Sequence, residues 1–187
     1  MYRIFSPGYI EIITGPMFSG KSEELIKRIK TLGFANAKTL VVKPSLDNRW
    51  KKDMIISRAG ASIETISANS AEEILKHVDD SYKAVAIDEA QFFKENLIDV
   101  VTQLANRGIR VIISCLDTDF AGQPFGQAPH LLAIAEFVTK LHAVCFVCGN
   151  AASMTYRKSN SNEVVIVGDE EYEARCRKCH QEGLLNK

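Results

Sequence analysis

The chain has 187 residues, of which 46% are apolar and 25% charged, and its 23 basic residues balance 23 acidic ones. This composition is typical of a globular domain with its own core, and a net charge of zero gives no field that would attract nucleic acid or a membrane surface. No stretch approaches the roughly 18 apolar residues of a membrane span, and the first residues lack the apolar segment of a secretory signal. We therefore expect a soluble cytoplasmic protein with no membrane or nucleic-acid partner.

The first predicted element is the strand Ile10–Thr14, which leads into Gly-Pro-Met-Phe-Ser-Gly-Lys-Ser at residues 15–22. This sequence matches the phosphate-binding loop G-x-x-x-x-G-K-[ST], and a helical pattern over Lys21–Leu32 follows it. In this order, backbone N–H groups and a helix N-terminus converge on one point and bind polyphosphate. We expect Lys21 to reach the β- and γ-phosphates and Ser22 to hold Mg²⁺. The loop residues predicted to bind the nucleotide are Gly15, Pro16, Met17, Phe18, Ser19, Gly20, Lys21 and Ser22.

Beyond this loop, short β-rich runs alternate with helical stretches. The predicted strands are Thr39–Lys43, Ala84–Asp88, Val111–Leu116 and Val138–Val144, and the predicted helices are Ala71–His77, Lys94–Asn106 and Leu131–Phe137. Uninterrupted apolar runs such as Ala84–Ile87 are typical of parallel strands buried on both faces. The repeated β-α-β order predicts an α/β fold, a RecA-like P-loop domain over residues 1–141 with helices on both faces of a parallel sheet. The polar stretch Pro44–Gly60 does not fit this pattern and is predicted to be a long functional or mobile loop.

An acidic pair, Asp88-Glu89, ends the apolar run Ala84–Ile87. The carboxyl ends of parallel strands form the edge at which α/β sheets bind ligands, so we expect Asp88 to lie near the metal of the phosphate site. Glu89 is the candidate catalytic residue, because it could accept a proton from an attacking hydroxyl group or water. Such a pair can also cap a solvated loop, but the phosphate-binding loop favours the catalytic interpretation.

Four of the five cysteines form two Cys-x-x-Cys pairs, namely Cys145, Cys148, Cys176 and Cys179. Two such pairs fit tetrahedral Zn²⁺, and four protein ligands leave no open position, so the expected role is structural. Helical periodicity is weak from residue 142 onward, and we predict a small zinc-binding domain over residues 142–187. Between the pairs, Glu163–Gly168 is predicted to be either a hairpin packed on the sheet or a lid whose backbone amides face a ligand.

Other interpretations of the cysteines stay open. Cys176–His180 also matches the C-x-x-C-H pattern of haem attachment, and either pair could be a redox dithiol, although no export signal or thioredoxin-like context accompanies them. His180 could replace Cys179 as the fourth zinc ligand, although the thiolate completes the symmetric pair. Cys115 lies in an apolar run and is predicted to be a core residue.

Four motifs, taken together, resemble the type II (cellular and bacterial) thymidine kinases. They are Gly15–Ser22, Asp88-Glu-Ala-Gln-Phe-Phe93, Leu116-Asp-Thr-Asp-Phe120, and the cysteine pairs with Tyr172 before the second pair. The resemblance runs from about Ile10 to Cys179. It implies transfer of the γ-phosphate of ATP to the 5′-hydroxyl of thymidine or deoxyuridine with Mg²⁺ and structural Zn²⁺. It also implies a homotetramer and feedback inhibition by dTTP.

The resemblance further implies roles for individual residues. Glu89 corresponds to the catalytic base, Phe120 to an aromatic residue that packs on the pyrimidine, and the four paired cysteines to the zinc ligands. The remaining residues implied at the nucleotide site are Asp47, Asn48, Arg49, Asp88, Ala90 and Gln91. A lasso that grips the base corresponds to Val164, Val165, Ile166, Val167, Gly168 and Tyr172. Many relatives have Gly-Gly where this chain has Gly168-Asp169, so the turn of the lasso can differ here.

The alternative function is that of a P-loop ATPase whose zinc ribbon binds nucleic acid or a protein partner. Such a protein should present a basic face with interleaved aromatic residues. The basic residues near the second cysteine pair are offset by acidic neighbours, which argues against this function; the residues concerned are Arg175, Arg177 and Lys178 against Glu170, Glu171 and Glu173.

Overall fold

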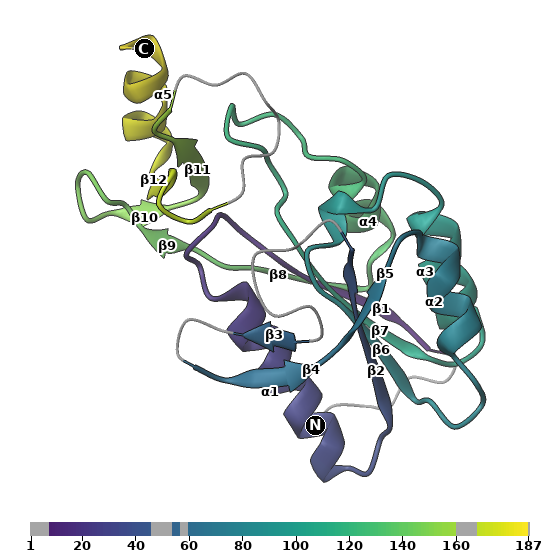
Figure 1. Ribbon diagram of the computed structural model, residues 1–187. Coiled ribbons are helices and arrows are strands. Elements are labelled where there is room, and N and C mark those ends of the chain that lie inside the picture. Colours follow the sequence, from purple (N-terminus) through teal and green to yellow (C-terminus); the bar gives the residue numbers. More distant parts are fainter. Residues whose placement is uncertain (1–7, 46–53, 57–59, 160–167, 187) are drawn as a thin grey trace.

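The computed structural model (Figure 1) describes residues 8–45, 54–56, 60–159 and 168–186. Its centre is a six-stranded sheet with the order β5-β2-β6-β7-β1-β8, in which every neighbouring pair is parallel. The strands are β1 (Ile10–Thr14), β2 (Thr39–Pro44), β5 (Ile66–Ala68), β6 (Ala84–Ile87), β7 (Arg110–Cys115) and β8 (Phe137–Lys140). All residues of β1 and β6 are buried, as expected for central strands covered on both faces.

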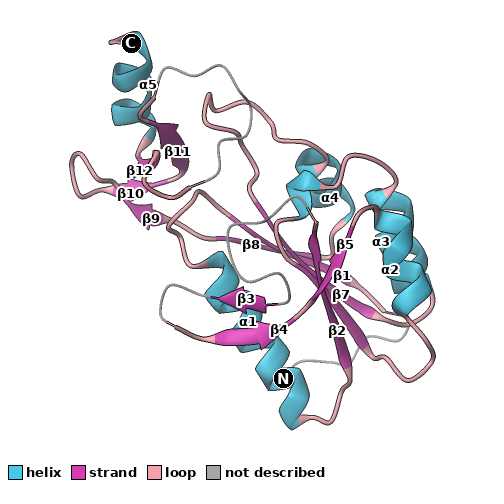
Figure 2. Cartoon of the chain, in the orientation of Figure 1, coloured by secondary structure: helices cyan, strands magenta, loops and turns pink. Residues whose placement is uncertain are grey.

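Helices cover both faces of the sheet (Figures 1 and 2). They are α1 (Lys21–Phe34), α2 (Ala71–His77), α3 (Leu97–Asn106) and α4 (Ala128–Ile134). Ile13 of β1 packs with the apolar residues of α1, whereas its neighbour Ile12 joins a separate core cluster with α2, α3 and α4. Because successive side chains of a strand point to opposite faces, these two clusters lie on opposite sides of the sheet. The predicted α/β fold is therefore confirmed.

A buried carboxylate links α1 to the sheet. Glu11 of β1 is 5% exposed, and its Oε2 atom lies 2.7 Å from Nη1 of Arg28 on α1. The other carboxylate oxygen pairs with Arg110 of β7, and Arg28 also donates to the Thr139 hydroxyl of β8 at 2.9 Å. The first helix is thus tied by polar contacts to β1 and β8, and through Glu11 to β7, in addition to its apolar packing.

The C-terminal part of the chain forms a smaller unit. Its elements are β9 (Ala143–Val144), β10 (Ala151–Ala152), β11 (Met154–Arg157), β12 (Tyr172–Arg175) and α5 (Arg177–Leu185). Strands β9 and β10 form one antiparallel pair and β11 and β12 another. The helix α5 was not predicted, because its sequence lacks a clear apolar stripe.

Several boundaries differ from the sequence-based prediction. The predicted strand Val138–Val144 is divided between β8 and β9. The predicted helix Lys94–Asn106 begins only at Leu97, since Asn96 has a φ of 58° that ends helical geometry on its N-terminal side. The polar stretch 44–60 contains a short strand, β3 (Met54–Ile56), which pairs with β4 (Ser62–Glu64).

The last helix of the main domain is also displaced from its prediction. The sequence pattern placed it over Leu131–Phe137, but α4 spans Ala128–Ile134 and Phe137 opens strand β8. Pro129 lies in its first turn, where proline is tolerated because the N–H there has no helical partner. Among helices in the described ranges, none combines the length and apolar character needed to cross a bilayer.

Candidate active site

The phosphate loop connects the end of β1 to the start of α1, as the sequence predicts (Figure 1). Gly15 has a φ of 144°, and a Cβ atom there would lie 2.4 Å from the carbonyl oxygen of Leu141, so only glycine fits. The buried Lys21 donates from Nζ to the Pro16 carbonyl oxygen at 2.9 Å, and the Ser19 hydroxyl donates to the same oxygen at 2.8 Å. These bonds close the loop on itself and hold the ammonium group over it.

The acidic pair lies at the carboxyl edge of the same sheet, directly after β6. Asp88 is buried, and its Oδ1 atom accepts a hydrogen bond from the Glu89 N–H at 3.0 Å. Burial, followed by the charge of Glu89, raises the pKa of Asp88 to about 6. Glu89 adopts left-handed geometry, with φ 51° and ψ 40°, which is a strained conformation of the kind found at functional sites.

The glutamine of this motif orients the glutamate. Gln91 is 4% exposed; its Nε2 donates to Oε2 of Glu89, and its Oε1 accepts from the Leu116 N–H at 3.0 Å. Both ends of the amide are therefore engaged, and the side chain connects Glu89 to the end of β7. Ala90, which the family resemblance implied at the nucleotide site, is fully buried in the core, so its side chain is not available to a ligand.

An ion pair lies across β1, the strand that leads into the phosphate loop. Asp117, just after β7, is 7% exposed and forms an ion pair with Lys140 at the end of β8. Because β1 lies between β7 and β8, this pair straddles the strand from which the loop emerges. Sequence reasoning missed it, although Asp117 lies in the Leu116–Phe120 motif. Cys115 is fully buried, and burial raises the pKa of its thiol to about 12, which confirms the core role predicted for it.

The four paired cysteines come together. All four Sγ atoms lie within 4.8 Å of one another, and those of Cys148 and Cys176 are 3.7 Å apart. Tetrahedral Zn²⁺ with bonds of about 2.3 Å places its sulfur ligands about 3.8 Å apart, so this donor set fits the metal. His180 is engaged elsewhere, since its Nε2 lies 2.9 Å from the carbonyl oxygen of Phe120. The structure therefore favours Cys179, and not His180, as the fourth ligand.

The cysteine-bearing unit packs on the phosphate loop. The Met17 N–H donates to the Thr155 hydroxyl of β11 at 3.0 Å. The ring of Phe18, which has a φ of 69°, lies 5.4 Å from that of Phe146 between the first two cysteines, centroid to centroid. Phe18 also packs against the small apolar cluster that contains Cys145 and Cys179. The metal-binding unit thus contacts the loop through one hydrogen bond to its backbone and through the side chain of Phe18.

The structure describes some, but not all, of the residues that the family resemblance implies at the substrate site. Phe120 is half-buried and Tyr172 is buried on β12, and Arg157 of β11 contacts both rings. Gly168 has a φ of 130°, a backbone conformation that favours glycine. The residues outside the described ranges are Asp47, Asn48, Arg49, Val164, Val165, Ile166 and Val167.

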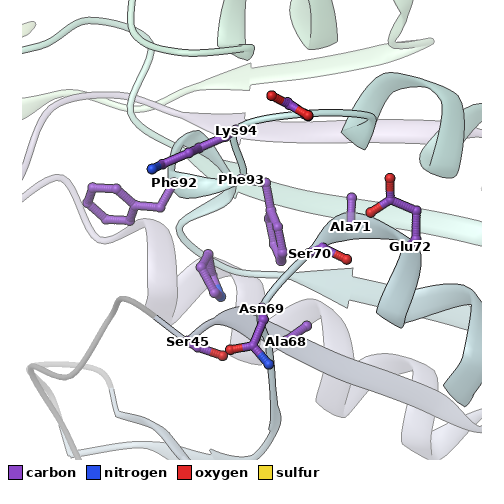
Figure 3. Close-up of a pocket in the computed structure, with 11 residues that line it drawn as sticks. Ser45, Ala68, Asn69, Ser70, Ala71, Glu72, Phe92, Phe93 and Lys94 are labelled. Atoms are coloured by element: carbon purple, nitrogen blue, oxygen red, sulfur yellow. The ribbon is translucent and has the colours of Figure 1, made fainter.

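A separate cavity of about 480 Å³ opens at the ends of β2 and β5. Figure 3 shows residues from these strand ends, from the start of α2 and from the segment after β6 gathered around it. Phe93 and Lys94 come from that last segment, and Asn69 and Ser70 precede α2. Of the predicted active-site residues that the structure describes, none lines this cavity.

The fold and the site define a P-loop nucleotide-binding protein with a thiolate cluster suited to zinc. The family model "Thymidine kinase" matches residues 8–180. The thymidine kinase of Mycoplasma mobile is 58% identical over 188 residues, which cover 100% of this chain and 94% of that protein. The thymidine kinase of Metamycoplasma arthritidis is 52% identical, with 100% and 97% covered. The chain belongs to the thymidine kinase family, and the resemblance inferred from its motifs is confirmed.

Among solved structures, the genome packaging NTPase B204 from Sulfolobus turreted icosahedral virus 2, in complex with ATP-gammaS, is similar in part. Its TM-score is 0.45 at 15% sequence identity, and the match covers 73% of this chain and 75% of that one. A likeness this weak adds nothing to the family assignment.

Proposed function

We propose that the chain transfers the γ-phosphate of ATP to the 5′-hydroxyl of thymidine, and of deoxyuridine, with release of ADP. The observation that carries this proposal is the position of Glu89 in a member of the thymidine kinase family. Its carboxylate lies at the carboxyl edge of the sheet beside Asp88, on the edge from which the phosphate loop emerges, and Gln91 fixes its orientation.

In the proposed reaction, the chain supplies positioning and charge, which dominate catalysis of phosphoryl transfer. The loop N–H groups and Lys21 bind the donor phosphates and offset their negative charge. Glu89 accepts the proton of the 5′-hydroxyl as its oxygen forms a bond to the γ-phosphorus and the bond from that phosphorus to the ADP oxygen breaks. Engagement of Lys21 and Ser19 with Pro16 keeps the loop in shape before the nucleotide binds.

Two metal ions belong to this proposal. The Ser22 hydroxyl and the Asp88 carboxylate are the groups that would hold Mg²⁺, which when bound offsets phosphate charge. A buried carboxylate and a hydroxyl suit that hard cation, since Mg²⁺ prefers oxygen ligands. The four thiolates would hold Zn²⁺, and the contacts of Thr155 and Phe146 would then fix the phosphate loop against the metal-binding unit.

Family membership also supports several further proposals. We propose that residues 1–141 form the nucleotide-binding domain and residues 142–187 a zinc domain with a lasso. In this proposal Asp47–Arg49 contribute to the nucleotide site, and Val164–Gly168 with Tyr172 grip the base. The assembly would be a homotetramer in the cytoplasm, with dTTP as feedback inhibitor and without nucleic-acid or membrane partners.

The test measures ADP release with and without nucleosides, for the wild type and for Glu89→Gln. Wild-type ADP release should rise sharply with thymidine, and Glu89→Gln should lower that rate about 10²- to 10⁴-fold while the KM for ATP stays unchanged, because only a proton acceptor is lost. Glu64→Gln, at an exposed position of β4, is the matched control and should behave as the wild type. If no pyrimidine nucleoside stimulates ADP release, the chain is a nucleoside-independent ATPase and the proposal is wrong.

A further inference from the structure

Among the residues that the structure describes, Arg157 of β11 is the largest fully buried polar side chain, and the reaction described above does not use it. It is 1% exposed, although burial of a guanidinium group is costly unless its charge and its donors are engaged. The contacts of this side chain therefore indicate what the protein gains by burying it.

The guanidinium group of Arg157 holds two aromatic rings. Its central carbon lies 3.6 Å from the ring centroid of Phe120 and 5.4 Å from that of Tyr172. Its Nη2 also donates to the Tyr172 hydroxyl at 3.0 Å. Arg157 and Tyr172 are register partners in the antiparallel β11–β12 pair, so the pairing of these strands fixes their spacing. Phe120, by contrast, lies on a loop after β7 and depends on such contacts for its orientation.

The guanidinium group occupies one side of the Phe120 ring. A guanidinium carbon 3.6 Å above the centroid covers one face of the ring. Phe120 as a residue is nevertheless only half-buried, so part of its surface stays accessible beside this contact. The His180 imidazole holds the backbone of the same residue through its carbonyl oxygen. Ring and backbone are thus both fixed by the metal-binding unit.

We propose that Arg157 is a positioning residue for the nucleoside, which holds Phe120 and Tyr172 so that the side of the Phe120 ring away from the guanidinium group stacks on the pyrimidine. This inference rests on the proposed function, in which Phe120 and Tyr172 belong to the nucleoside site. Arg157 acts through the two rings and not on the reacting atoms. Its loss should therefore weaken nucleoside binding and leave the chemical step and the ATP site unchanged.

The experiment compares the steady-state constants of Arg157→Met, Arg157→Lys and the wild type. Arg157→Met removes the cation and its donors, and the KM for thymidine should rise about 10- to 30-fold. Arg157→Lys restores the charge without the planar donor group and should recover part of that loss. For both variants, kcat and the KM for ATP should stay within about two-fold of the wild type, because the contacts that position the two rings involve Phe120 and Tyr172 and not the phosphate loop.

Arg175→Met is the matched control. Arg175 lies on the neighbouring strand β12, and its guanidinium carbon is 3.5 Å from the ring centroid of Tyr156. The Tyr156 hydroxyl donates a hydrogen bond to the carbonyl oxygen of Gly183 on α5. The contact of Arg175 with Tyr156 is the same kind of stack in the same unit but on a different ring. Because its Nη1 also donates to the carbonyl oxygen of Cys179 at 3.3 Å, the comparison uses variant protein whose zinc content equals that of the wild type. The KM for thymidine of this variant should match the wild type. Zinc content and the urea midpoint are measured for every variant.

Each result decides between the two proposals. Wild-type protein without thymidine-dependent ADP release refutes the proposed function, and with it the inference. An active wild type with an unchanged KM for thymidine in Arg157→Met refutes the inference alone, as does an equal effect on kcat and on both KM values. If Arg157→Met does not fold, Tyr172→Phe removes only the hydroxyl acceptor. Its KM for thymidine should rise about 3- to 10-fold, and an unchanged value refutes the inference.

Discussion

The buried carboxylate of Asp88 should make the protein less stable as the pH rises. Burial first, and the charge of Glu89 second, raise its pKa from 3.8 to about 6. Because the folded pKa is above the unfolded one, the folded state holds this proton more tightly, and the free energy of unfolding falls between these two pH values as the group ionises. A shift of about two pKa units corresponds to a full cost of about 3 kcal/mol at pH 8. About half of that cost develops between about pH 5 and pH 8.

Asp88→Asn removes the titrating group and keeps an oxygen that can accept the Glu89 N–H bond. In the protein without nucleotide or metal, the free energy of unfolding of this variant relative to the wild type should therefore increase by roughly 1 to 2 kcal/mol from pH 5 to pH 8. Urea unfolding followed by circular dichroism at several pH values measures this difference. Asp80→Asn, at an exposed position, is the control and should show no such trend. A difference for Asp88→Asn that does not change with pH, or that decreases toward pH 8, refutes the reasoning.

Three further predictions concern the metal, the loop and the fold. Cys148→Ser should lose Zn²⁺, measured by atomic absorption, and raise the KM for thymidine; tight thymidine binding in zinc-free protein would contradict the role of the metal. Thr155→Val removes the acceptor of the Met17 N–H at the phosphate loop. It should raise the KM for ATP about 5- to 10-fold, and an unchanged value would show that the bond does not shape the loop. Glu11→Gln leaves Arg110 without this carboxylate and Arg28 with Glu24 alone, and should lower the free energy of unfolding by about 2 to 3 kcal/mol in urea titrations; a loss below about 1 kcal/mol would show that the buried pair contributes little.

The local features of this protein were predictable from its sequence. The phosphate loop, Gly15–Ser22, works through the backbone of eight consecutive residues, so the motif and its flanking strand and helix were sufficient to place it. The acidic pair could be placed for the same reason, since it directly follows the buried run of β6. The cysteine pairs predicted a zinc site because each Cys-x-x-Cys turn supplies two ligands by itself.

The sequence therefore determined which chemical groups the protein has and which short segments present them. Only the tertiary structure decided how those groups hold one another. Gln91 engages Glu89 and the end of β7, Arg157 lies between Phe120 and Tyr172, and Lys140 reaches Asp117 across β1. Most of these contacts join residues that are far apart in the chain, and each depends on strand order, register and burial. A local sequence pattern does not specify strand order, register or burial, because these arise only when the strands assemble into the sheet and the metal-binding unit packs on it.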